Sequence, residues 1–256
     1  MSSSSFVEGA RYIDFAFEQA QRNGLKILLE LHGAPGSQNG WDHSGRSGTL
    51  GWHTSERNIQ DTLNVLEELA KRYGKHPAIC GIGLLNEPRG DVPIDSLKKF
   101  YQDSYSRIRK HTGAGVEIVM HDAFRASEWK GFMQPPAYSH VQLDTHLYQC
   151  FTDEDRKRTV QEHVAFAFDR KKHLDMMSKE LPTIVGEWSI ALPPEVYRGL
   201  SPVQASNAKR AYGAAQLLNY ESTQGWFYWS YKLEGTSDWS FRQCVENGWL
   251  PNNLAA

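Results

Sequence analysis

The sequence predicts an α/β fold of the TIM or (β/α)8 barrel type, with six of the eight strands present. Three observations predict this fold. Short apolar runs alternate with helical patterns along the 256 residues, polar side chains follow the apolar runs, and no GxGxxG turn occurs. Repeated βα units leave open a closed barrel or an open doubly wound sheet. Because polar groups end many strands instead of marking one switch point, the barrel is favoured.

Six short runs rich in apolar residues are the predicted strands. Their continuous apolar character is typical of strands that are buried on both faces of a parallel sheet. Gly33 ends the first run, and Pro88 stops the second. The six runs lie at residues 25–33, 78–87, 115–122, 140–148, 182–188 and 225–231.

Helical spacing of apolar residues fills the segments between these runs. Before the second run, for example, Ile59, Leu63 and Leu66 fall on one helical face. Since helices alternate with strands, we expect right-handed parallel βαβ units in one catalytic domain over residues 1–256. The predicted helices cover residues 5–24, 55–73, 95–110, 154–179 and 201–223, with a shorter helical patch around residue 128.

Composition argues against several classes of function. The formal net charge is −2, with 28 basic and 30 acidic residues, so we expect no basic surface for nucleic acid or a membrane. No run reaches the ~20 apolar residues of a membrane span. Cys80, Cys150 and Cys244 can form at most one disulfide, and they lack a zinc motif. We therefore expect neutral partners and no metal or other cofactor.

Two glutamates occupy equivalent places in this pattern. Glu87 and Glu187 are each the first carboxylate after a buried apolar run, so both are expected at the mouth of the barrel. Two carboxyls about 5–5.5 Å apart can cleave a glycosidic bond with retention, one as nucleophile and one as acid and base. A single glutamate at a strand end is more often a solvated or salt-bridged residue. The pair is hard to explain by packing, because further polar and aromatic residues end the runs: His32, Asn86, His121, Asp122, His146, Tyr148 and Trp229.

Several of these residues also have structural interpretations. His32 could be a core histidine and Trp229 could fill the barrel, while we expect His121 and Asp122 to orient neighbours or to form a turn. Three histidines near carboxylates also suggest a metal site. No His-x-His or His-x-x-x-His spacing occurs at these positions, so metal-dependent hydrolysis is the weaker hypothesis.

Five motifs resemble glycoside hydrolase family 5, in particular the fungal exo-β-1,3-glucanases, or glucan 1,3-β-glucosidases. They follow the family's order across nearly the whole chain: LELHGAPGSQNGWD, LLNEP, DTHLYQCF, IVGEWS and WFYWSYKLEGTSDWSF. The resemblance implies a (β/α)8 barrel with Glu87 as acid/base after the fourth strand and Glu187 as nucleophile after the seventh. It implies cleavage of terminal β-D-glucosyl units from β-1,3-glucan or a β-glucoside, through a covalent glycosyl-enzyme intermediate.

The resemblance also implies a set of substrate-binding residues. Asn86 would bond the 2-hydroxyl of the sugar, and Tyr148 would bond the nucleophile carboxylate. His32 and His146 would line the subsite of the terminal glucose. Trp229 would form the floor of that subsite, because the apolar face of a pyranose stacks on an indole ring.

An aromatic pair holds the next sugar in the family, and Trp41 and Phe151 stand at the matching positions. The family has phenylalanine where this chain has Trp41, which leaves the acceptor or aglycone open. Fungal rutinosidases, which cleave diglycosides from flavonoids, share the fold and many of these motifs. A diglycosidase acting on plant glycosides is therefore one alternative, and a carbohydrate-binding remnant with impaired catalysis is another.

Two strands of the family pattern have no counterpart in this sequence. They carry an acidic residue that holds the terminal sugar and an arginine that supports the nucleophile. We therefore expect a chain truncated at its N-terminus, with strands 3 to 8 of the family present and with self-association through the open sheet edges. The resemblance implies an extracellular or cell-wall location, whereas the chain as written has no signal peptide and would remain cytoplasmic.

Overall fold

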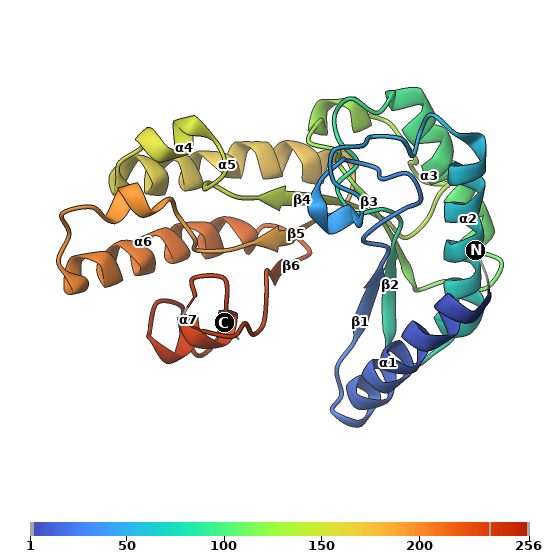
Figure 1. Ribbon diagram of the computed structural model, residues 1–256, viewed down its shortest axis with the longest axis horizontal. Coiled ribbons are helices and arrows are strands. Elements are labelled where there is room, and N and C mark those ends of the chain that lie inside the picture. The colour runs from blue at the N-terminus through green and yellow to red at the C-terminus, as the bar shows by residue number, and fades with distance from the viewer. Residues whose placement is uncertain (1–2, 236, 255–256) are drawn as a thin grey trace. The chain divides into compact units, whose positions relative to one another are not determined.

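The computed structural model of the chain describes residues 3–235 and 237–254, with side chains from residue 9 onward (Figure 1). The chain divides into two compact units, Met1–Gln142 and Leu143–Ala256. The strands are β1 (Ile27–Glu30), β2 (Ile79–Gly83), β3 (Glu117–His121), β4 (Val141–Leu147), β5 (Thr183–Trp188) and β6 (Gly225–Tyr228).

Hydrogen-bonded neighbours in the sheet follow chain order from β1 to β6. The β1–β2, β2–β3, β4–β5 and β5–β6 pairs are parallel. This is the order expected for six successive units of a (β/α)8 barrel. The predicted α/β class and all six predicted strands are confirmed, and a single catalytic domain over residues 1–256 stays a prediction.

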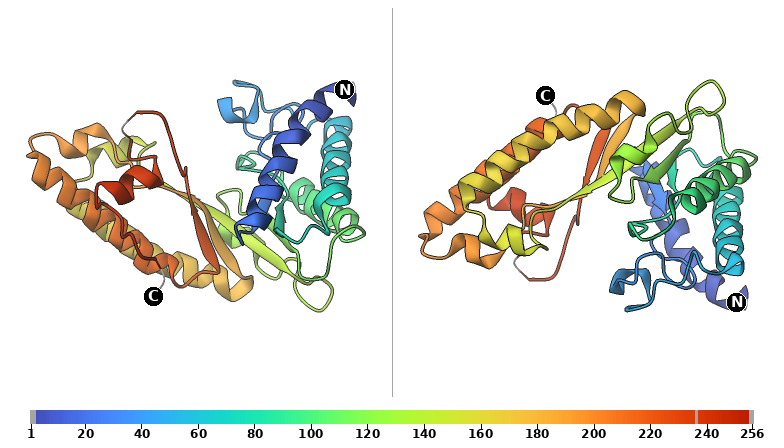
Figure 2. Two further views of the ribbon diagram at one scale, coloured as in Figure 1. Left: turned by 90° about the horizontal axis from the view of Figure 1, so that it is seen from below. Right: turned by 90° about the horizontal axis from the view of Figure 1, so that it is seen from above.

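The first unit packs its helices against β1, β2 and β3. Phe17 stacks on Tyr73 with ring centroids 4.6 Å apart, which fixes the first helix against the second. The second and third helices lie side by side (Figure 2). Gly24, at φ +67°, lets the chain turn out of the first helix into β1. The helices of this unit are α1 (Ser3–Arg22), α2 (Glu56–Tyr73) and α3 (Ile94–Ile108), with 3-10 turns η1 (Asp42–Ser44) and η2 (Ala126–Trp129).

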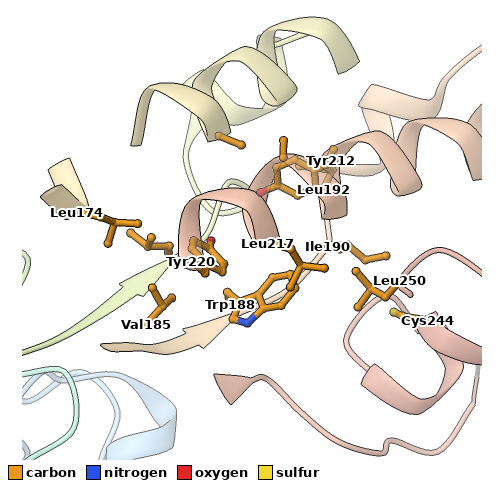
Figure 3. Close-up of a cluster of buried hydrophobic side chains, with 13 residues drawn as sticks. Leu174, Val185, Trp188, Ile190, Leu192, Tyr212, Leu217, Tyr220, Cys244 and Leu250 are labelled. Atoms are coloured by element: carbon orange, nitrogen blue, oxygen red, sulfur yellow. The ribbon is translucent and has the colours of Figure 1, made fainter. Parts of the chain in front are cut away.

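The second unit has its core between β5 and two long helices. Trp188 is completely buried in this core, beside Tyr220 (Figure 3). Its ring meets those of Tyr220, Trp226 and Tyr228 edge to face at 5.2, 5.2 and 4.8 Å. The two long helices, α5 and α6, run side by side (Figure 1). The helices of this unit are α4 (Asp153–Lys157), α5 (Val160–Glu180), α6 (Pro202–Tyr220) and α7 (Phe241–Glu246), with the 3-10 turn η3 (Pro194–Tyr197).

The prediction of one continuous helix over residues 154–179 was wrong. The structure has two helices there, α4 and α5, with Arg158 and Thr159 between them. Thr159 begins α5 with a capping box, in which its hydroxyl accepts from Glu162 N–H and the Glu162 carboxylate accepts from Thr159 N–H. A capping box needs no glycine or proline, so no helix breaker marks this boundary. The short α7 also escaped prediction, because six residues give no clear periodicity.

None of the helices in the described part of the chain is long and apolar enough to cross a membrane. Cys80, Cys150 and Cys244 are all free.

Candidate active site

The first unit places Asn86 and Glu87 beyond the end of β2. The backbone still bonds to both neighbouring strands there, since Leu84 N–H donates to Val119 O at 2.9 Å and Asn86 N–H donates to Leu31 O at 3.0 Å. The segment is therefore held as firmly as the strand itself. In barrels of this class, the carboxyl ends of the strands carry the active site.

Glu87 has an unusual backbone conformation. Its φ is +42°, in the left-handed region, and the residue is only 8% exposed. A residue other than glycine in this region costs about 1–3 kcal/mol and persists only where its surroundings hold it. Pro88 follows and cannot continue a strand. The backbone that carries the carboxyl group is thus both rigid and strained.

The loop after β1 supplies the side chains that hold the backbone of Asn86 and Glu87. Gln38 and Asn39 are completely buried. Gln38 Nε2 donates to Asn86 O at 2.9 Å and to His32 O at 3.0 Å. Asn39 Nδ2 donates to Glu87 O at 3.1 Å. Two buried amides therefore fix the carbonyls of both Asn86 and Glu87.

The side-chain amide of Asn86 has unmet hydrogen-bonding capacity. The residue is 1% exposed, and within the described part of the chain neither its Nδ2 nor its Oδ1 has a hydrogen-bond partner. Leaving a buried polar group unpaired costs about 1–3 kcal/mol. Such a group at the end of a barrel strand is well suited to a ligand hydroxyl, which can both donate and accept.

Two histidines of the first unit lie near the Glu87 carboxyl. His43 Nε2 is 3.3 Å from Glu87 Oε2. A ring nitrogen of His121 and a carboxylate oxygen of Glu87 lie within 4.8 Å of each other. His121 Nδ1 accepts from Ala123 N–H at 2.9 Å, so the proton of the neutral ring is on Nε2. This bond closes the turn after β3, which is the structural role expected for His121.

His32 follows β1 and is partly exposed. Its Nδ1 lies 3.1 Å from Glu30 Oε2, and its ring lies 5.3 Å from that of His43. Trp41 is 37% exposed and meets the His43 ring at 5.6 Å and the Phe124 ring at 6.0 Å. Phe124 is itself 49% exposed. The first unit therefore presents two partly exposed aromatic rings beside its glutamate.

The second unit places Glu187 at the end of β5, in contact with two side chains from β4 and its end. Tyr148 Oη donates to Glu187 Oε2 at 2.8 Å, the contact that the resemblance implies. His146 Nδ1 lies 3.5 Å from the same oxygen. A donor to a carboxylate favours its ionised form, which is the form that a nucleophile needs.

Asp144 orients this group from within β4. It is 8% exposed; its Oδ1 accepts from Gly186 N–H at 2.7 Å, and its Oδ2 lies 3.4 Å from His146 Nε2. A Cβ at position 186 would lie 2.2 Å from Asp144 Oδ1, so only glycine fits there. Asp144 thereby ties the strand that bears Glu187 to the histidine that faces it.

Phe151 and Trp229 are the partly exposed aromatic residues predicted in this unit. Phe151 is 64% exposed, and its ring lies 5.3 Å from Tyr148 and 6.1 Å from Trp239. Trp229 follows β6, is 43% exposed and donates its backbone N–H to Trp188 O at 2.9 Å.

Asp155 holds the backbone at Phe151. Its Oδ2 accepts from Phe151 N–H at 3.2 Å and from Thr152 N–H at 3.0 Å, and it pairs with Arg158. Burial alone would raise the pKa of Asp155, but the bonds from Thr152 and the charge of Arg158 outweigh burial and hold this pKa below its ordinary value.

Sequence reasoning missed several residues of these two groups. Gln38 and Asn39 lie inside a quoted motif, His43 directly follows that motif, and Asp144 lies inside a predicted strand, but none of them ends an apolar run. A buried carboxylate in the middle of an apolar strand was the one signal that could have singled out Asp144. Phe124 looks like an ordinary apolar residue in the sequence, so only its 49% exposure distinguishes it.

Comparisons with known proteins identify the family of the chain. Residues 8–235 match the family of cellulases, glycosyl hydrolase family 5. A glucan 1,3-beta-glucosidase of Blumeria graminis is 35% identical over 97% of this chain and 66% of the relative. The enzyme of the same name from Candida oleophila is 33% identical over 99% of this chain and 68% of the relative. The chain thus spans about two thirds of the length of these relatives.

A solved structure extends the likeness to the fold. The rutinosidase from Aspergillus niger superimposes with a TM-score of 0.74, covering 90% of this chain and 68% of that chain at 17% sequence identity. Identity this low establishes a shared fold and no shared substrate. Together with the family match over residues 8–235, it makes the six-stranded sheet an incomplete TIM-type barrel. The chain belongs to glycosyl hydrolase family 5.

Proposed function

We propose that the chain is a retaining glycoside hydrolase that removes terminal β-D-glucosyl units, with β-1,3-glucan as the preferred substrate. Glu187 attacks the anomeric carbon, while Glu87 gives its proton to the glycosidic oxygen of the leaving group. Water then displaces Glu187 from the covalent intermediate and gives its proton to Glu87. Two inversions leave the sugar with its original configuration. The reaction requires no metal or other cofactor.

Contacts within each unit support these roles. The donor from Tyr148 stabilises the ionised form of Glu187, as a nucleophile requires. The side-chain amide of Asn86 has no hydrogen-bond partner within the described part of the chain, so it is suited to bind the 2-hydroxyl of the sugar. This interaction strengthens in an oxocarbenium-like transition state. His32 and His146 line the subsite of the terminal glucose, above Trp229, and Trp41 and Phe151 hold the next sugar.

One observation carries the proposal. Each compact unit of this family member carries a glutamate at or beyond the end of a strand, and each glutamate has a polar partner. The partner of Glu87 is His43, and the partner of Glu187 is Tyr148. The relatives named glucan 1,3-beta-glucosidase favour a β-1,3-glucan substrate.

A mechanism-based inhibitor tests the reaction. We expect 2,4-dinitrophenyl 2-deoxy-2-fluoro-β-D-glucoside to label Glu187, with the modified peptide identified by mass spectrometry. Glu87→Gln should still be labelled, because dinitrophenolate leaves without a proton, whereas Glu187→Gln should not. Binding of laminari-oligosaccharides without any labelling would instead identify a carbohydrate-binding remnant.

A diglycosidase is the second candidate, because Trp41 replaces a phenylalanine of the glucanase pattern and leaves the acceptor open. The two candidates differ in substrate. Hydrolysis of laminari-oligosaccharides with rutin left intact supports the glucanase, and the reverse supports the diglycosidase. We also propose that the enzyme acts outside the cell or in the cell wall, which detection of the protein in medium and wall fractions would test.

A further inference from the structure

His43 makes an ion-pair contact with Glu87, the proposed acid/base, within the first unit. Its Nε2 lies 3.3 Å from Glu87 Oε2, with 37% of the His43 side chain and 11% of the Glu87 side chain exposed. His43 lies in η1, whose backbone is fixed because Ser44 N–H and Ser44 Oγ both bond to Trp41 O, at 3.1 and 2.7 Å. The imidazole is therefore presented to the carboxyl by a rigid turn.

We propose that His43 is a positioning residue, which donates from Nε2 to Glu87 Oε2 and leaves Oε1 to exchange the proton with the glycosidic oxygen. This inference rests on the proposed role of Glu87 as acid and base. The bond forms in both states of Glu87, because Oε2 accepts whether Oε1 bears a proton or not. His43 thus fixes the rotamer of the carboxyl throughout the reaction.

The same contact gives a shared proton two possible sites. A pair with one exchangeable proton can hold it on Glu87, with a neutral His43, or on His43, with an ionised Glu87. Only the first arrangement can protonate a leaving group. Within the first unit, the other titratable groups facing the pair are His32, whose ring lies 5.3 Å from that of His43, and His121, which reaches within 4.8 Å of the Glu87 carboxylate.

A measurement that needs no activity tests the pair itself. In histidine NMR titrations, we expect the midpoint of His43 to fall by about one pH unit in Glu87→Gln, because the variant removes a negative charge beside the ring. His111 is the matched control, since its Nε2 lies 3.2 Å from Glu67 Oε1. Its midpoint should move in Glu67→Gln and stay unchanged in Glu87→Gln. An unchanged His43 midpoint in Glu87→Gln would overturn the proposal.

Kinetics of His43 variants test its role in the reaction. His43→Leu removes the donor, so kcat/KM for a phenyl glucoside should fall at least about tenfold, while kcat/KM for a dinitrophenyl glucoside should barely change. His43→Gln keeps a donor and should restore most of the phenyl glucoside rate. Equal losses with both leaving groups would refute positioning of the acid. A wild-type protein without glycosidase activity would defeat the proposed function, while the NMR result would still decide the pairing.

Discussion

Glu87 combines a left-handed backbone with a buried carboxyl group. Neither feature favours the folded state, because glutamate rarely adopts φ +42° and a carboxyl loses hydration at 8% exposure. The proposed role of Glu87 as acid/base would account for both features. The sharp turn aims the carboxyl, and burial strengthens the interactions that control its proton.

Glu87→Gly should therefore stabilise the protein while abolishing activity. Glycine adopts positive φ without steric cost, so we expect the free energy of unfolding to rise by about 1 kcal/mol. Urea denaturation followed by circular dichroism would measure this change. Glu117→Gly is the control, since it lies within β3, where glycine should cost about 0.5–1 kcal/mol. A large loss of stability in Glu87→Gly would show that the side chain itself holds the turn.

Tyr148→Phe tests the partner of the second glutamate. The variant removes the donor at 2.8 Å from Glu187 Oε2 and keeps the aromatic ring beside Phe151. A hydrogen bond to a charged group contributes about 1.5–3 kcal/mol, so kcat/KM on aryl glucosides should fall by about 10- to 100-fold. The acid limb of kcat/KM should move to higher pH, because the ionised nucleophile loses a stabilising donor. A pH profile identical to that of wild type would contradict this role for Tyr148.

At the scale of elements, small capping structures decide where the partly exposed aromatic residues lie. The Asp155 carboxylate caps the turn at Phe151 and pairs with Arg158, just before α5 begins at its own capping box. Side-chain caps substitute for backbone bonds that a helix end lacks. The carboxylate that caps the start of α4 thus also fixes the backbone of an exposed ring, Phe151.

Asp155→Asn should destabilise the protein in a pH-dependent way. The lowered pKa of Asp155 means that its ionised form stabilises the fold above the unfolded pKa of about 3.9, and that this stabilisation is lost as the pH falls through the folded pKa. We expect the variant to lose about 1–2 kcal/mol at neutral pH, with the difference from wild type shrinking below about pH 4. Urea unfolding at several pH values would measure it. A difference that does not vary with pH would mean that charge contributes nothing.

The elements differ in how far the sequence predicts them. The six strands could be predicted because each lies in a short run rich in apolar residues. Burial on both faces accounts for such runs in the inner strands, whereas β1 and β6 are only partly buried. The boundary at Thr159 could not be predicted, because hydrogen bonds between Thr159 and Glu162 replace any helix breaker. Glu87, Glu187 and Asn86 could be found because they end or adjoin the runs. Gln38 and Asp144 could not, since their roles depend on partners brought together only by folding.

At the scale of the whole molecule, the sheet has two terminal strands. In the part of the chain that the structure describes, β1 pairs only with β2, and β6 pairs only with β5. A terminal strand offers backbone donors and acceptors to any extended segment. The other edge of each terminal strand is thus a surface on which a further chain segment can pair.

The 256-residue chain produced alone should therefore self-associate. We expect analytical ultracentrifugation at micromolar concentration to give a mass above the 29.1 kDa of one chain, returning towards that value on dilution. Salt should change the equilibrium little, because backbone bonds and apolar contacts carry no net charge. A species of 29.1 kDa at every concentration would contradict association through the sheet edges.

The three unpaired thiols have a practical consequence. Burial raises the pKa of Cys150 to about 12 and that of Cys244 to about 11, and it also raises the pKa of Cys80. All three therefore remain protonated and slow to alkylate near neutral pH, and folding in a reducing host requires no oxidant. A cysteine introduced by Tyr231→Cys, at a position 69% exposed, should then be the fastest to react with a maleimide dye. A fluorophore there, two residues after Trp229, would test whether a sugar binds at the proposed subsite without any chemical turnover.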